Sequence, residues 1–249
     1  MSAEAISARS LTVRYGAIAA LTDVSFELPF GASVAVLGPN GSGKSTLLAA
    51  AVGLKKPASG SIDLGTARVA YAPQQLDLEA SFPVTVADVV RMGRWGELGW
   101  LGRFGEHDHE LVEGAIEALG LAGLRDRRLG EVSGGQRQRA LLAQAAAQDA
   151  RLLLLDEPFS GVDAPTRQAI IEQISGWRDE GRTIVVTTHD LESAARDYDI
   201  VVCLNGSLIA CGPPEQACTE QTLVRTFAGH AVRVGESLVD VAHHHEGAG

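Results

Sequence analysis

Short apolar runs alternate with helical patterns along the chain and predict an α/β fold. The runs that we expect to form buried strands are residues 33–37, 68–71, 152–156, 183–188 and 200–204. Helical patterns lie between them, among them residues 45–51, 137–147 and the amphipathic stretch 109–119. Residues 11–28 alternate in the manner of paired surface strands, so an antiparallel β region is expected ahead of the first buried strand.

The composition limits the classes of protein to which the chain can belong. Its 249 residues, 45% of them hydrophobic, can bury the core of one α/β domain with an inserted subdomain. The net charge of −10 argues against general nucleic-acid binding, which needs a basic face. Neither a signal peptide nor an apolar run of about twenty residues is evident, so we expect a cytosolic protein.

The run that ends at residue 37 leads directly into a phosphate-binding pattern. Residues 38–45 read Gly-Pro-Asn-Gly-Ser-Gly-Lys-Ser and match G-x-x-x-x-G-K-[ST] at every defined position. In the order strand, loop, helix, the glycines let backbone N–H groups point at phosphate oxygens, and the helix N-terminus adds its dipole. A chance glycine-rich turn is the weaker alternative. We expect the nucleotide to be held by Gly38, Pro39, Asn40, Gly41, Ser42, Gly43, Lys44, Ser45 and Thr46.

A second strand pattern ends in two adjacent carboxylates. Four leucines precede Asp156 and Glu157, and the strand-stopping Pro158 follows. Since successive strand residues face opposite ways, the two carboxylates should have different roles. We expect Asp156 to assist a Mg²⁺ ion together with Ser45, and Glu157 to polarise the attacking water. A solvated pair of loop acids is the alternative.

A third motif identifies a family. Residues 132–136, Val-Ser-Gly-Gly-Gln, precede a helical pattern that Ser133 can cap, which leaves glycine amides at the helix N-terminus. Together with the two preceding motifs, this segment resembles the signature sequence of ATP-binding cassette (ABC) ATPases, in which Leu is commoner than Val at the first place. The likeness runs roughly from residue 6 to residue 212.

The resemblance implies roles for further residues in this sequence. Tyr15 is similar to the aromatic residue that stacks on adenine, and Gln74 to the glutamine that touches Mg²⁺ or water and senses the membrane subunit. Asp163 falls in a segment like the family's dimer-facing loop, and His189 is similar to the histidine that contacts the γ-phosphate. Lys44 would reach the β- and γ-phosphates. Taken one at a time, each residue has a simpler interpretation. Tyr15 would be a packing residue, Gln74 a solvated loop residue, and His189 a residue that hydrogen-bonds nearby backbone.

The same resemblance implies the architecture and the assembly. It predicts a P-loop NTPase (RecA-like) core with an antiparallel β subdomain and an α-helical subdomain at about 84–140, all within one ATPase domain at 6–228. Residues 229–249 would then be a flexible tail. Two copies are expected to sandwich two ATP molecules, with the signature residues of one copy contacting the nucleotide of the other; these residues are Ser133, Gly134, Gly135 and Gln136.

The transported cargo is suggested by two shorter segments. Residues 82–86, Phe-Pro-Val-Thr-Val, and the Gly-Val-Asp of 161–163 resemble the ATPases of zinc and manganese importers. Such a chain would work with an integral membrane permease at the cytoplasmic face of the membrane and with an extracytoplasmic metal-binding protein. Zinc is the cargo that we favour, followed by manganese. ATPases of iron-chelate or cobalamin importers, efflux systems, and soluble ABC ATPases of translation or DNA repair remain alternatives.

Histidines and cysteines add little to this picture. His243, His244 and His245 would suit a metal sensor, although a disordered polar tail is the favoured interpretation. Cys203, Cys211 and Cys218 form no C-x-x-C pattern and are interpreted as structural thiols in a reducing compartment.

Overall fold

The computed structural model describes residues 4–74, 83–98, 102–227, 232–234 and 237–239. By their contacts these residues form two compact units. The first unit consists of the chain up to residue 65 together with the chain from residue 187 onward, and the second consists of residues 66–186.

The first unit contains two groups of strands. In one group, β1 (Glu4–Tyr15) lies between β2 (Ile18–Pro29) and β4 (Ser59–Leu64), and both pairings are antiparallel. In the other group, β3 (Ser33–Leu37) pairs in parallel with β8 (Ile200–Leu204), which pairs antiparallel with β9 (Leu208–Gly212). Every residue of β3 is buried, as its apolar run predicts.

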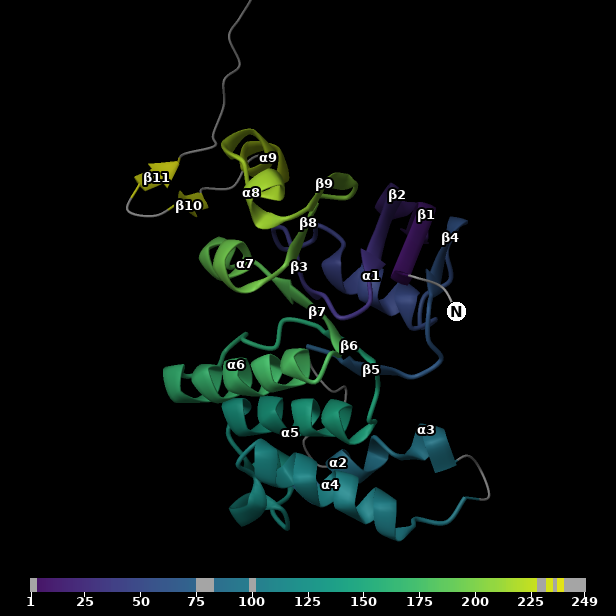
Figure 1. Cartoon of the computed structure of the whole chain (residues 1–249), viewed down its shortest axis with the longest axis vertical. Helices are drawn as coiled ribbons and strands as arrows, with labels where there is room; N and C mark the ends of the chain where they lie inside the picture. Colours follow the sequence, from purple (N-terminus) through teal and green to yellow (C-terminus); the bar gives the residue numbers. More distant parts are fainter. Residues whose placement is uncertain (1–3, 75–82, 99–101, 228–231, 235–236, 240–249) are drawn as a thin grey trace, which may run out of the picture. The chain divides into compact units, whose positions relative to one another are not determined.

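Short helices accompany these strands in Figure 1. They are α1 (Lys44–Ala51), α7 (Leu191–Asp197), α8 (Pro214–Ala217) and α9 (Glu220–Thr226). Near the end of the chain, β10 (Val232–Val234) and β11 (Ser237–Val239) form an antiparallel pair.

The second unit has a core of parallel strands. They are β5 (Val69–Ala72), β6 (Leu152–Leu155) and β7 (Thr183–Thr188), whose last two residues fall in the first unit's range. β6 pairs with β5 on one side and with β7 on the other. All four leucines of β6 are 0% exposed, so this strand is the centre of the unit's core.

Helices make up the rest of the second unit. They are α2 (Val86–Met92), α3 (Trp95–Leu98), α4 (Glu106–Ala118), α5 (Gly134–Ala147), α6 (Ala164–Asp179) and the short 3₁₀ turns Ala122–Leu124 and Leu129–Glu131. Figure 1 shows α5 between α6 on one side and α2 and α4 on the other. Buried alanines and leucines along α5 allow this close packing.

The strands expected at residues 33–37, 183–188 and 200–204 have those bounds in the structure, and those expected at 68–71 and 152–156 are displaced or shortened by one residue. The helix expected at 109–119 begins earlier, at Glu106, because the Asp108 carboxylate accepts the backbone N–H of Gly105 (2.9 Å). Strands β4 and β9 were not expected, and neither is fully buried.

The cysteines lie closer together than their spacing suggests. Cys203 is buried in β8, and its thiol donates to the backbone oxygen of Ala217 (3.5 Å), the residue directly before Cys218. Interaction with the Cys218 thiol, followed by burial, raises the pKa of Cys203, and the same interaction lowers the pKa of Cys218. None of the three cysteines forms a disulfide.

Two expectations fall partly or wholly outside the described residues. The three histidines at 243–245 lie outside them, as does most of the tail at 229–249. The bounds of the domain at 6–228 and of its helical part at 84–140 stay predictions. Within the described residues, no helix is long and apolar enough to cross a membrane.

The cap of α2 gives a prediction about stability. Thr85 Oγ1 accepts the backbone N–H of Asp88 (3.1 Å), and the Asp88 carboxylate accepts the Thr85 hydroxyl (2.7 Å) and backbone N–H (3.0 Å). The hydroxyl bond is the main cause that holds the pKa of Asp88 below its usual value. Thr85→Ala should lower the free energy of unfolding at pH 7 by about 1 kcal/mol.

The pH dependence follows from the direction of that shift. A carboxylate with a lowered native pKa adds stability above its ordinary pKa of about 4 and loses it as the pH falls further. The stability difference between wild type and Thr85→Ala, measured by denaturant titration, should therefore shrink between about pH 5 and pH 2. An equal difference across that range would show that the Asp88 carboxylate takes no part in the cap.

Candidate functional site

The phosphate-binding pattern forms a tight loop between β3 and α1. A side chain at Gly38 would place its Cβ 2.2 Å from the backbone oxygen of Leu204, and Gly41 has a left-handed φ of 80°. These two positions require glycine for different reasons, close approach in the first case and backbone conformation in the second. The sequence prediction of strand, loop and helix is thus confirmed at this segment.

Two polar side chains of the loop point into buried surroundings. Lys44 is 4% exposed, and its Nζ donates hydrogen bonds to the carbonyl oxygens of Gly38 (2.8 Å) and Pro39 (3.0 Å). The Ser42 hydroxyl is buried and has no hydrogen-bond partner among the described residues. A cradle of backbone N–H groups with a buried cation and an unpartnered hydroxyl fits an anionic phosphate chain.

Backbone hydrogen bonds from neighbouring segments hold the phosphate-binding loop in place. Gly206, in the turn after β8, donates its N–H to Ser42 O (2.9 Å), and Thr22 of β2 donates to Gly206 O (2.8 Å). These bonds join the loop to both groups of strands in the first unit, so its shape does not depend on the loop residues alone.

Tyr15 and His189 are the other predicted site residues of the first unit. Tyr15, at the end of β1, is 49% exposed, and the ammonium of Lys55 lies 4.1 Å from the centre of its ring. His189 is exposed directly after β7, next to Asp190, which caps α7 by accepting the Ser193 N–H (3.1 Å). The exposed ring of Tyr15 is accessible for stacking, and the Lys55 contact, 40 residues away in sequence, gave no sequence signal.

In the second unit, the two carboxylates follow β6 as predicted. Asp156 is 3% exposed and donates its backbone N–H to Ala72 O (2.9 Å), which extends the pairing of β6 with β5. Glu157 has a left-handed φ of 45°, and its carbonyl oxygen accepts the Ser160 N–H (3.0 Å) in a tight turn. A left-handed glutamate is strained, and such strain is found most often at functional sites.

Gln74 and Glu157 lie next to each other beyond the carboxyl ends of β5 and β6. β5 and β6 run in parallel, so their carboxyl ends lie side by side, and Gln74 Nε2 donates to Glu157 Oε2 (3.1 Å). The two residues are 83 positions apart, and only their separate family likenesses were visible in the sequence. The hydrogen bond leaves the amide oxygen of Gln74 as the atom that can bind a cation.

The signature-like segment begins α5. Ser133 caps the helix by accepting the Gln136 N–H (3.2 Å), and the Gln136 side chain accepts the Ser133 N–H (2.9 Å). The predicted capping role of Ser133 is confirmed, and the Gln136 side chain is also engaged in the cap. Gly134 and Gly135 form the first turn, where unsatisfied backbone N–H groups favour an anion.

Asp163 caps the adjacent helix α6. Its carboxylate accepts the Thr166 N–H (3.0 Å), and hydrogen bonding from Thr166 is the main cause that lowers the pKa of Asp163. A Cβ added at Gly135 would lie 3.2 Å from Thr166 Oγ1, so the first turns of α5 and α6 lie close together.

The structure thus brings the predicted residues together in two sets. The first unit holds the phosphate loop, Tyr15 and His189, and the second holds Gln74, the two carboxylates, the signature segment and Asp163. Among the described residues, no group of three His, Cys, Asp or Glu side chains is placed to hold a metal ion.

Comparison with known proteins identifies the family. The family profile described as "ABC transporter" matches residues 21–160, more than half of the chain. The chain belongs to the ABC transporter family. It binds ATP and is an ATPase.

Relatives in this family match over most of their length. The zinc transport system ATP-binding protein TroB of Treponema pallidum is 42% identical, covering 92% of this chain and 88% of TroB. The manganese transport system ATP-binding protein MntA of Synechocystis sp. is 40% identical, covering 90% of each chain. The chelated iron transport system membrane protein YfeB of Yersinia pestis is 45% identical, covering 84% of this chain and 74% of YfeB.

A solved structure confirms the fold. The chain aligns with a protein described as an inward-facing metal-chelate type ABC transporter at a TM-score of 0.81, with 29% identity and 95% of each chain covered. The predicted α/β P-loop NTPase architecture, with its antiparallel sheet and helical part, is therefore confirmed.

Two glycine variants separate the constraints on the phosphate loop. Gly41→Ala adds a side chain in open space, so only its left-handed backbone opposes it, at a cost of about 1–2 kcal/mol. Gly38→Ala must displace the Leu204 carbonyl, so it should lower both the free energy of unfolding and the ATP affinity more than Gly41→Ala. Denaturant titration and ATP binding measured on both variants check this order; the reverse order would contradict the close packing.

Proposed function

We propose that this ATPase powers the import of a divalent metal ion, zinc first and manganese next, through a separate integral membrane permease. The observation that carries the proposal is the likeness, over about 90% of the chain, to ATP-binding subunits named for zinc and manganese transport. The site described above supplies the hydrolytic part of this function.

The proposed chemistry divides the site residues by role. The phosphate loop holds the ATP phosphates, Lys44 neutralises their charge, and Tyr15 stacks on adenine. Glu157 orients and polarises the attacking water, and His189 contacts the γ-phosphate. Positioning and charge stabilisation then account for most of the rate enhancement.

Magnesium would be held by Ser45, Gln74 and Asp156. A hydroxyl, an amide oxygen and a carboxylate are the hard oxygen donors that Mg²⁺ prefers. When bound, the ion would supply positive charge that offsets the negative charge of the phosphates during transfer. The observation that supports this set is the Gln74 amide, whose nitrogen is bonded to Glu157 and whose oxygen is directed elsewhere.

Each nucleotide site is proposed to be completed by a second copy of the chain. Ser133, Gly134, Gly135 and Gln136 of one copy would contact the ATP that is held by the other, and Asp163 would lie at the contact between the copies. The open N-terminus of α5 supports this role, because its first amides favour an anion.

The membrane partner would bind the helical part from the cytoplasmic face of the membrane. Trp95 of α3 is 60% exposed, and a large exposed aromatic side chain is typical of a protein contact. An extracytoplasmic metal-binding protein would deliver the cargo to the permease. Iron-chelate uptake is the second candidate, favoured by the similarity to YfeB; cobalamin-type uptake or an efflux system would use the same cassette.

The hydrolytic assignment is tested by Glu157→Gln. This change keeps the shape of the side chain and its ability to contact Gln74 but removes the negative charge that polarises water. Steady-state ATPase activity should fall by at least about 100-fold, while ATP affinity measured by fluorescent-nucleotide titration stays within about twofold of wild type. Undiminished turnover would show that Glu157 is not the base.

The cargo is tested by tracer uptake in metal-limited cells. Cells with the wild-type chain should accumulate radioactive zinc faster than cells with Glu157→Gln, and competition by unlabelled zinc should exceed competition by manganese. Uptake of an iron chelate alone would favour the second candidate, and faster loss of preloaded metal with the wild-type chain would indicate efflux.

A further inference from the structure

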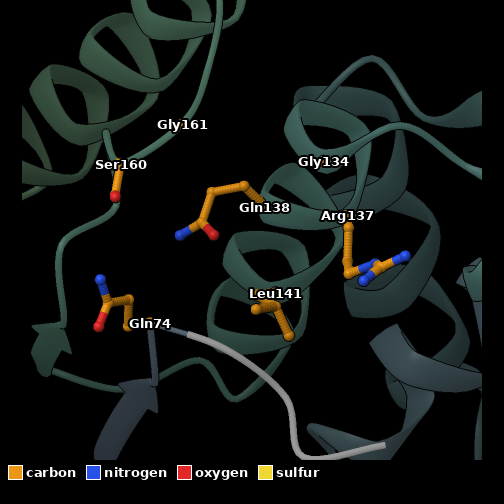
Figure 2. A pocket seen from close by; sticks show the side chains of 7 residues that line it. All are labelled: Gln74, Gly134, Arg137, Gln138, Leu141, Ser160 and Gly161. Atoms are coloured by element: carbon orange, nitrogen blue, oxygen red, sulfur yellow. The ribbon is translucent and has the colours of Figure 1, made fainter. Parts of the chain in front are cut away.

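A pocket of about 310 Å³ in the second unit lies beside the Gln74–Glu157 contact. It is lined by Gln74 after β5, by Gln138 and Leu141 of α5, and by Ser160 and Gly161 of the turn after β6. Figure 2 shows the Gln138 side chain extending from α5 into the space between Ser160 and Gln74.

Gln138 is a buried side chain with an unused donor. It is 7% exposed, and its Nε2 has no hydrogen-bond partner among the described residues. A buried amide donor left unpaired destabilises a fold, whereas an apolar side chain of the same size would not. Leu141, one helical turn further on, shows that an apolar side chain is tolerated on this wall. Packing alone therefore does not explain a glutamine at position 138.

Ser160 offers a hydroxyl acceptor in the same pocket. It is exposed on the opposite wall of the pocket, and Figure 2 shows its hydroxyl directed into the same space as the Gln138 amide. Its backbone N–H already closes the turn on Glu157 O (3.0 Å), so a contact at Ser160 acts directly on the backbone of Glu157.

The backbone conformation of the turn that begins at Glu157 depends on its contacts. Glu157 holds a left-handed φ of 45°, and strained conformations persist where surrounding contacts fix them. Glu157 accepts the Ser160 N–H at its carbonyl oxygen (3.0 Å) and the Gln74 side-chain amide at its carboxylate (3.1 Å), and Arg167 lies over the ring of Phe159 in the same turn. A contact from α5 would connect the turn to the helix that carries the signature segment.

We propose that Gln138 is a positioning residue for ATP hydrolysis: in the ATP-loaded enzyme its Nε2 donates to Ser160 Oγ and holds the turn that aims Glu157. The inference rests on the proposed role of Glu157 as the residue that polarises water. Gln138 acts through Ser160 and touches neither nucleotide nor water. It links the start of α5, where a second copy's ATP would bind, to the residue that governs hydrolysis in its own copy.

Three variants of the full-length chain test this role. Gln138→Met keeps the volume and removes the donor, Ser160→Ala removes the acceptor, and the third variant combines both changes. Each single change should lower kcat for ATP about tenfold, the effect of losing one hydrogen bond, with KM for ATP unchanged. The combined variant should be no slower than the slower single variant, because both changes break the same contact.

Thermal unfolding separates this role from simple packing. Gln138→Met should unfold at the same temperature as wild type or higher, since it removes an unpaired buried donor. A variant that is stable yet slow supports positioning. A kcat within twofold of wild type for both single variants, or losses that multiply in the combined variant, would overturn it. If Gln138→Met fails to fold, Ser160→Ala in the exposed turn still decides the question.

A crystal structure provides a test that does not depend on turnover. With Mg²⁺ and a non-hydrolysable ATP analogue, Gln138 Nε2 should lie about 3 Å from Ser160 Oγ. A separation beyond 3.5 Å in that state would overturn the proposal. The Glu157→Gln variant tests the assigned role of Glu157 separately. If this variant retains turnover, the role of Glu157 is wrong. If it is inactive while the Gln138 and Ser160 variants turn over ATP like wild type, only the positioning role of Gln138 is refuted.

Discussion

Backbone hydrogen bonds between β5 and β6, two short parallel strands, hold together the end of the second unit's sheet at which Gln74 and Glu157 lie. Their register pairs Ala72 with Leu155, and the bond from Asp156 N–H to Ala72 O carries it one residue further. Gln74 and Glu157 can meet only because this register places both just beyond the strand ends. A slip of one residue would exchange the directions of Asp156 and Glu157 and separate the carboxylate from the amide. A slip that carried the exposed Arg151 into a fully buried position of β6 would also be costly.

Several local rules of protein structure are broken close to this end of the sheet and at the phosphate loop. Glu157 has a left-handed backbone, the hydroxyl of Ser42 and the amide nitrogen of Gln138 are buried without partners among the described residues, and Gly38 leaves no room for a side chain. Each feature destabilises the fold or forbids ordinary substitutions. Each unit has such features near residues that resemble a hydrolytic site, which is where such departures are expected.

Much of this organisation could be predicted from the sequence, because its signals are local. The phosphate loop, the leucine run before Asp156 and the Ser133 cap are continuous segments whose spacing determines their structure. Contacts between distant segments left no such signal: the Gln74–Glu157 bond, Lys55 over Tyr15 and the Cys203–Cys218 thiol pair depend on tertiary packing. The helical pattern at 137–147 likewise predicted α5 but gave no indication that Gln138 points into a pocket.

Completion of each nucleotide site by a second copy of the chain is tested most directly by the molar mass of Glu157→Gln in solution. Light scattering at tens of micromolar protein should give 26.1 kDa without nucleotide and twice that mass with ATP and Mg²⁺, because trapped ATP keeps the two copies closed on each other. A mass of 26.1 kDa with ATP demonstrably bound would contradict the two-copy site.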